Sequence, residues 1–129
     1  MPHLTITWDD PAESIVLLDV HADYTWDEFN AAVAQVSALA AAKPHRCDIL
    51  INLGKYSAES SGIPAIQKAL AALDHLPQNV GLIVIVVGGL AGLIFNAAKR
   101  LDSRVASRAR TAQIVEKARE LIGHARRSA

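Results

Sequence analysis

The sequence predicts an α/β fold with a mixed, mostly parallel sheet. Short apolar runs rich in β-branched residues alternate along the chain with amphipathic stretches of helical periodicity. The first two strand-like runs are joined by a turn rather than by a helix, which adds an antiparallel hairpin to the units that follow. With 51% hydrophobic and 20% charged residues in 129, the chain is expected to fold as one domain over residues 1–129.

The N-terminal third predicts a hairpin and a helix. Residues 4–8 alternate apolar and polar side chains, residues 9–11 (Asp-Asp-Pro) form a turn, and residues 14–20 make the second strand. Thr25 begins the helix, with Glu28 at the spacing of a capping box. Helical spacing places one apolar face on this helix, made of Trp26, Phe29, Val33, Val36 and Ala40.

The middle of the chain predicts two strand–helix units. The first is an apolar strand over residues 48–53 and a helix that begins near Ser61 and stops at Pro77. The second is a strand over residues 81–87 and a helix from about Leu90.

The C-terminal part predicts a short strand over residues 109–112 and a last helix over about residues 113–126. This helix is expected to bury Val115, Ala118, Leu121 and Ile122. The predicted order of elements is therefore β-β-α-β-α-β-α-β-α.

The net charge is zero, but the charges are unevenly placed. Residues 1–42 hold seven Asp and Glu and no Lys or Arg, whereas residues 99–129 hold nine Lys and Arg and three acids. A solvated helix face is the simpler interpretation of the basic end, and an acidic partner is the alternative. Because almost no aromatic residues interleave these bases, no nucleic-acid partner is expected. The split charge and exposed apolar helix surface also favour a homodimer.

Few residues indicate catalysis or cofactor binding. The five histidines show no metal-ligand spacing, and Gly88-Gly89 lies in no phosphate-binding glycine pattern, so neither a metal nor a cofactor is expected. No enzymatic activity is predicted. Cys47 is the only cysteine, which excludes an intramolecular disulfide and favours the reducing cytoplasm, and a signal peptide is not expected.

One stretch has the length of a membrane span. Residues 80–98 contain no charge, but the first half is dominated by β-branched residues and Gly88-Gly89 interrupts it. A buried strand, a tight turn and an amphipathic helix fit better than membrane insertion.

The segment Glu59-Ser60-Ser61-Gly62-Ile63 is the strongest functional candidate. It follows an apolar strand and stands where a helix begins. A hydroxyl there caps the helix, and a phosphate on the same hydroxyl would be held by the helix N-terminus. From the residues alone, the cap is the simpler of the two interpretations.

This segment and the order of elements resemble the STAS domains, which include the SpoIIAA-like anti-sigma-factor antagonists. The family pattern Asp-Ser-Ser-Gly-Leu corresponds here to residues 59–63, and the likeness in element order covers nearly the whole chain. The resemblance implies a single-domain SpoIIAA/STAS-like fold, related to lipid-binding Sec14-type domains. The resemblance also implies a non-enzymatic regulatory domain with a protein partner, such as an anti-sigma-type kinase.

In this interpretation Ser61 is the phosphorylation candidate, with Ser60 beside it, and Glu59, Gly62 and Ile63 complete the interaction loop. The alternative function is binding of a small apolar or lipid-like ligand, with Trp26 and Phe29 lining an apolar pocket. Alternatively, Trp26 and Phe29 are ordinary residues of the hydrophobic core.

Overall fold

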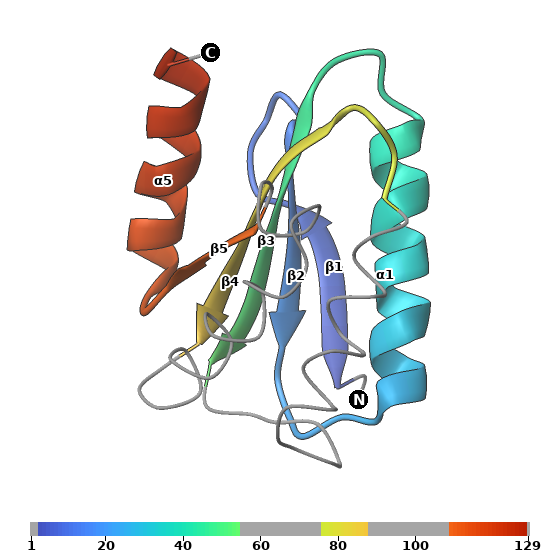
Figure 1. The fold of residues 1–129 in the computed structure, drawn as a ribbon. Helices are drawn as coiled ribbons and strands as arrows, with labels where there is room; N and C mark the ends of the chain where they lie inside the picture. Colours follow the sequence, from blue (N-terminus) through green and yellow to red (C-terminus); the bar gives the residue numbers. More distant parts are fainter. Residues whose placement is uncertain (1–2, 55–75, 88–108, 129) are drawn as a thin grey trace.

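A five-stranded sheet separates two helices in the computed structural model (Figure 1). The structure describes residues 3–54, 76–87 and 109–128. Helix α1 (Trp26–Ala41) packs against one face of the sheet and α5 (Val115–Ser128) against the other. The predicted α/β class is confirmed. The helices predicted near Ser61 and from about Leu90 lie outside the described residues.

The sheet is mixed, as predicted, and its strands follow the order of the chain. The strands are β1 (Leu4–Trp8), β2 (Ile15–Val20), β3 (Cys47–Gly54), β4 (Val80–Val87) and β5 (Ala109–Ala112). β1 is antiparallel to β2, and every later pair of neighbours is parallel. β4 occupies the first half of the uncharged stretch and pairs with strands on both sides, so the strand interpretation of that half is confirmed.

A tight turn joins β1 to β2. The Glu13 N–H donates to the Asp10 carbonyl at 3.1 Å, with Pro11 at the second position of the turn, where its fixed φ fits. Glu13 follows with φ 53°, the left-handed conformation that often closes such hairpin loops. The Asp10 carboxylate accepts hydrogen bonds from the N–H groups of Ser14 and Ile15 at 2.8 and 2.9 Å. The predicted turn is confirmed.

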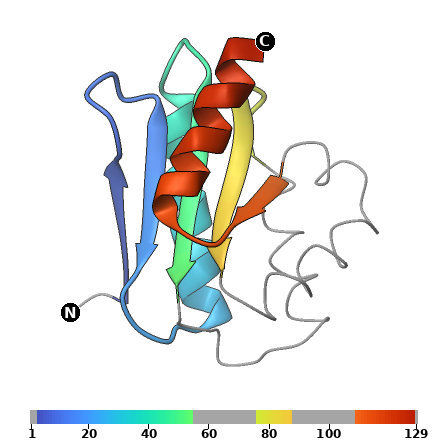
Figure 2. The ribbon, with the colours of Figure 1, turned by 90° about the vertical axis from the view of Figure 1, so that its left-hand side faces the viewer.

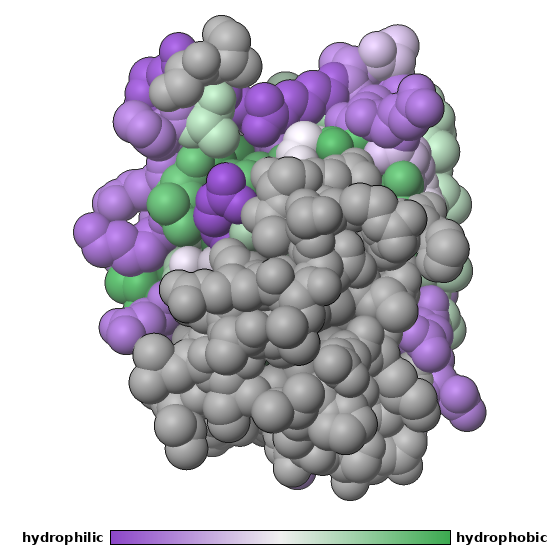
Figure 3. Space-filling model, viewed as in Figure 1, coloured by the Kyte–Doolittle hydropathy of each residue, from purple (hydrophilic) through white to green (hydrophobic). Residues whose placement is uncertain are grey.

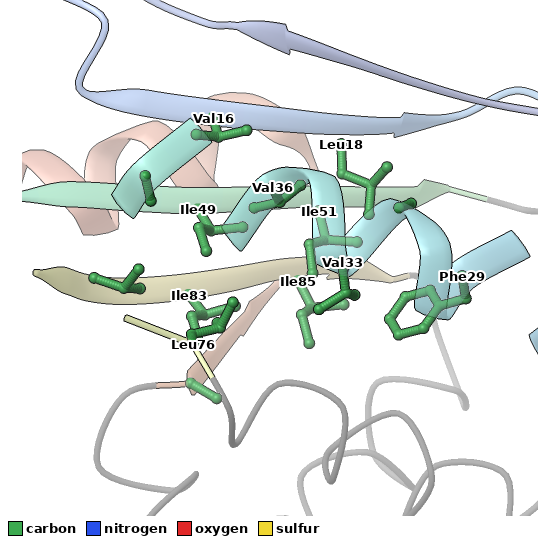
Figure 4. Packing of buried hydrophobic residues seen from close by; sticks show 14 of the residues in the cluster. Val16, Leu18, Phe29, Val33, Val36, Ile49, Ile51, Leu76, Ile83 and Ile85 are labelled. Carbon is green, nitrogen blue, oxygen red and sulfur yellow. The ribbon is translucent and has the colours of Figure 1, made fainter. Parts of the chain in front are cut away.

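The larger part of the core lies between α1 and the sheet. The predicted capping box begins α1: the Glu28 N–H donates to the Thr25 hydroxyl, and the Thr25 N–H donates to the Glu28 carboxylate. Figure 4 shows Phe29, Val33 and Val36 directed at apolar side chains of three neighbouring strands. The strand residues labelled there are Val16, Leu18, Ile49, Ile51, Ile83 and Ile85.

The opposite face of the sheet is covered by α5, which crosses β3 and β4 and leaves β1 and β2 beside it (Figure 2). Ala118 and Ile122 are buried against Leu50, Leu82 and Val84. Leu121, which the sequence predicts in this stripe, is 36% exposed, so that prediction is wrong. Its position directly before Ile122 turns it about 100° away from the sheet-facing line of the helix.

A buried carboxylate joins α5 to the sheet. Asp48 is completely buried, and its Oδ2 accepts a hydrogen bond of 2.7 Å from the Arg126 Nε near the end of α5. Its Oδ1 lies 3.0 Å from the Arg46 Nη2 and accepts the Leu82 N–H at 2.7 Å. Both oxygens are therefore paired, which removes most of the cost of burying the charge.

Arg126 extends this contact to the hairpin. Its Nη2 donates to the Ser14 carbonyl at 2.9 Å and its Nη1 to the Ser14 hydroxyl at 3.1 Å, while that hydroxyl donates to Asp10. Asp10, Ser14, Arg46, Asp48 and Arg126 form what we call the strand-start network, because they gather where β2, β3 and β4 begin. Its hydrogen bonds and ion pairs connect β2, β3, β4 and α5 at one end of the sheet.

Gly81 leaves the space that the strand-start network needs. A Cβ on Gly81 would overlap the Arg46 guanidinium and would lie 2.7 Å from the Asp48 Oδ1. Any larger side chain would therefore push Arg46 away from the buried carboxylate.

Replacing Asp48 with Asn should lower the free energy of unfolding by about 3 kcal/mol, because two guanidinium groups lose their buried counter-charge. Urea unfolding followed by circular dichroism measures this change. Asp27→Asn, at an exposed position in the first turn of α1, is the matched control and should cost about 0.5 kcal/mol. Equal losses in the two variants would contradict the role given to Asp48.

Asp10 should make folding sensitive to acid. Burial raises the pKa of Asp10, but the hydrogen bonds from Ser14 and Ile15 and the charge of Arg126 together lower it below its usual value. The stabilisation is therefore complete above the unfolded pKa of about 3.9 and is lost as the pH falls through the folded value. Asp10→Asn should be less stable near neutral pH and converge with the parent chain in acid. A stability difference that stays constant with pH would argue against this.

Candidate functional site

The carboxyl edge of the sheet is the candidate site. β2 ends at Val20 and β3 at Gly54, and both strands run towards the edge where β1 and α1 begin, at the bottom of Figure 1. In open α/β sheets this edge is where ligands and partners usually bind, because the connecting loops gather there.

The predicted interaction loop follows the central strand of the sheet. Gly54 ends β3, which lies between β2 and β4, and Glu59 comes five residues later in the sequence. Glu59, Ser60, Ser61, Gly62 and Ile63 themselves lie outside the described residues. The described chain reaches the carboxyl edge at Gly54.

Polar side chains form a row across three strands near this edge. Thr5, Asp19 and Asn52 occupy paired positions on β1, β2 and β3. The Asn52 Nδ2 donates to the Asp19 Oδ1 at 3.0 Å. Burial alternates along β2, so this row lies on the face opposite α1.

Two histidines lie beside the row, His3 just before β1 and His21 just after β2, and the His21 N–H donates to the His3 carbonyl at 2.7 Å. The His21 Nε2 lies 2.8 Å from the Thr5 hydroxyl, and the His3 Nδ1 lies 2.8 Å from the Glu28 Oε2. The histidine side chains are 48% and 49% exposed, so about half of each remains open to a partner. We call His3, Thr5, Asp19, His21, Glu28 and Asn52 the strand-end cluster.

The strand-end cluster places a histidine next to a hydroxyl. A histidine next to a hydroxyl is one part of an activated nucleophile, but the base must be oriented by an acid on its other ring nitrogen. The Asp19 Oδ2 approaches the same Nε2 of His21 that meets Thr5, at 3.9 Å. Among the described residues, no three His, Cys, Asp or Glu side chains gather as a metal site.

Hydrogen bonding holds Glu28 in its charged form. The Thr25 N–H and then the His3 side chain lower the pKa of Glu28 below its usual value. Glu28 therefore stays ionised at neutral pH and connects the start of α1 to His3, one residue before β1.

Of the two predicted pocket residues, only Phe29 has a described side chain. Phe29 is 3% exposed and stacks on Tyr24 with ring centroids 6.0 Å apart. Burial and the nearby Asp23 charge raise the pKa of Tyr24 to about 12. Trp26 begins α1, and its side chain lies outside the described part of the structure. The packing of Phe29 is that of a core residue.

Neither the strand-start network nor the strand-end cluster was predicted from the sequence. A lone aspartate in the apolar strand Cys47–Gly54 was the available signal for the strand-start network, since a buried charge requires a partner. No comparable signal in the sequence indicates the strand-end cluster. Thr5, Asp19 and Asn52 come together through the register of β1, β2 and β3, and His3 meets Glu28 of α1 through tertiary packing.

Comparisons with protein-family models, curated proteins and solved structures give no match for this chain. Of the helices in the described ranges, α1 and α5 are both too short to qualify as membrane spans.

Replacing Thr25 with Ala should lower the free energy of unfolding by about 1 kcal/mol, because the Glu28 N–H loses its capping acceptor. Thr25→Ser keeps the oxygen and is the control, with an expected change of a few tenths of a kcal/mol, about one third of the alanine effect. Urea unfolding measures both. An alanine variant as stable as the serine variant would show that the capping box does not stabilise α1.

Proposed function

We propose that this chain is a non-enzymatic STAS-like protein-interaction domain, resembling anti-sigma-factor antagonists, that acts through the segment around Ser61. Phosphorylation of Ser61 would add close to two negative charges and change the surface that the partner meets. The partner in this proposal is a protein regulator of the kinase or anti-sigma type. The proposal also includes a cytoplasmic location and a fold of the STAS type over the whole chain.

The observation that carries this proposal is the origin of the Ser61 segment. Glu59, the first residue of the segment, comes five residues after Gly54 in the sequence, and Gly54 ends the central strand at the edge that holds the half-exposed histidines of the strand-end cluster. Loops at this edge rest on a rigid sheet and reach solvent, which suits reversible contact with a protein.

The sheet order adds support. One antiparallel strand followed by four strands that are parallel to one another is a mixed, mostly parallel sheet, the kind of sheet that the resemblance implies. The buried Cys47 agrees with a reducing compartment: burial, and next the charge of Asp48, raise the pKa of its thiol, so it behaves as a core residue.

Ser61→Asp should lower recovery of the partner about tenfold, equivalent to about 1.4 kcal/mol, because a fixed negative charge imitates part of the phosphate effect. Ser61→Ala should bind as well as the parent chain. Affinity capture from the cells of origin with quantitative mass spectrometry measures partner recovery and locates phosphate on Ser60 or Ser61.

Ser57→Asp is the matched control, since it adds the same charge four residues earlier in the sequence and should leave recovery unchanged. The proposal fails if Ser61→Asp recovers the same proteins in the same amounts as the parent chain. Equal losses in the Ser57 and Ser61 variants would indicate a general charge effect.

A further inference from the structure

A groove of about 640 Å³ lies between β5 and the outer flank of α5. Its lining combines apolar surface with charged and polar side chains, namely Thr111, Ala112, Gln113, Lys117, Glu120, Leu121, His124 and Arg127. None of these residues belongs to the strand-start network, the strand-end cluster or the Ser61 segment.

The two flanks of α5 use their positive charges differently. On one flank Arg126 pairs with Asp48 at 2.7 Å, and Arg119 makes two hydrogen bonds to Asp9 at 2.8 and 2.9 Å. On the other flank Lys117 and Arg127 line the groove. The part of α5 that is visible at the left of Figure 3 is mostly hydrophilic, with hydrophobic areas between.

Two cationic residues of the groove stand on either side of an apolar one along α5. Lys117 and Arg127 are ten residues apart on the helix, a rise of about 15 Å, and Leu121 lies between them with 36% of its surface exposed. The Arg127 Nη1 reaches back along the helix to within 3.4 Å of where a Cβ on Gly123 would lie. A peptide with acidic residues on either side of an apolar one can meet both cations and cover Leu121.

The chain's own acidic third is a poor occupant of this groove. Many of its carboxylates are already engaged within the chain: Asp9 with Arg119, Asp10 with Ser14, Glu13 with Lys43, Asp19 with Asn52, and Glu28 with His3. A second copy of this chain therefore offers fewer carboxylates free to enter the groove than its sequence suggests.

We propose that the α5–β5 groove is a docking site for an acidic, amphipathic peptide segment of another protein. Lys117, His124 and Arg127 face its acidic side chains, and Leu121 and Ala112 pack against its apolar one. This site is separate from the Ser61 segment, and its test does not depend on the outcome of the Ser61 experiments.

Glu120 makes the proposal sharply testable. Its carboxylate lies 3.2 Å from the Lys117 Nζ and competes with an acidic peptide for that cation. Removing this charge should strengthen binding, an effect that damage to the fold would not produce.

The probe is a fluorescein-labelled peptide of about eight residues, long enough to span the groove in extended form, in which glutamates flank leucines. Fluorescence anisotropy with the full chain measures its affinity. We expect Lys117→Gln and Arg127→Gln each to weaken binding about 2–5-fold, Leu121→Asp to weaken it about tenfold, and Glu120→Gln to strengthen it about 2–5-fold.

Lys43→Gln is the matched control, because it removes the same charge beyond the end of α1 and should leave the affinity unchanged. Ser61→Asp should also leave it unchanged, which separates this site from the proposed switch. A second peptide with glutamine in place of glutamate should bind at least about tenfold more weakly.

The proposal is overturned if the acidic peptide shows no saturable binding, or if the glutamine peptide binds equally well. It is also overturned if single-stranded oligothymidylate binds more tightly than the peptide. Sedimentation provides the last test: a dimer of the parent chain that Leu121→Asp dissociates would assign the groove to a second copy instead.

Discussion

The buried carboxylate of Asp48 is the interaction on which the arrangement of this protein most depends. Burying a charge is costly unless its oxygens are paired, and here two guanidinium groups and one backbone N–H pair them. The partners come from the residue before β3, from β4 and from α5, and Arg126 adds the β1–β2 hairpin through Ser14. Because the Asp48–Arg126 ion pair fixes the position of the C-terminal end of α5, the groove between α5 and β5 depends on it as well.

The two ends of the sheet have different characters. At the amino ends of the parallel strands, the strand-start network holds its polar groups in internal hydrogen bonds around a buried charge. At the carboxyl ends, the strand-end cluster leaves two histidines about half exposed, and the segment with Ser61 follows from the central strand. A rigid end opposite an accessible end is an arrangement that suits binding of a partner without change of the fold.

Helix α5 shows how one helix serves both structure and recognition. Its apolar line of Ala118 and Ile122 packs on the sheet, and the flank beside that line supplies Arg119 and Arg126 to carboxylates of the same chain. The remaining flank keeps Lys117 and Arg127 beside the groove. Helical periodicity thus places some of the positive residues of α5 on the flank that forms ion pairs within the chain, and others on the flank that is exposed beside the groove.

Periodicity and short-range chemistry were sufficient to predict much of the described fold. The five strands, the turn at Pro11 and the capping box of Thr25 and Glu28 depend on residues within a few positions of one another, so the sequence by itself determined them. The pairing of Asp48 with Arg126, the exposure of Leu121 and the row of Thr5, Asp19 and Asn52 were decided only by the tertiary structure. Asp48 and Arg126 are 78 residues apart, and their contact follows from strand register and the direction in which α5 crosses the sheet. Local sequence patterns specify neither the strand register nor the direction of α5, because both result from how whole elements pack.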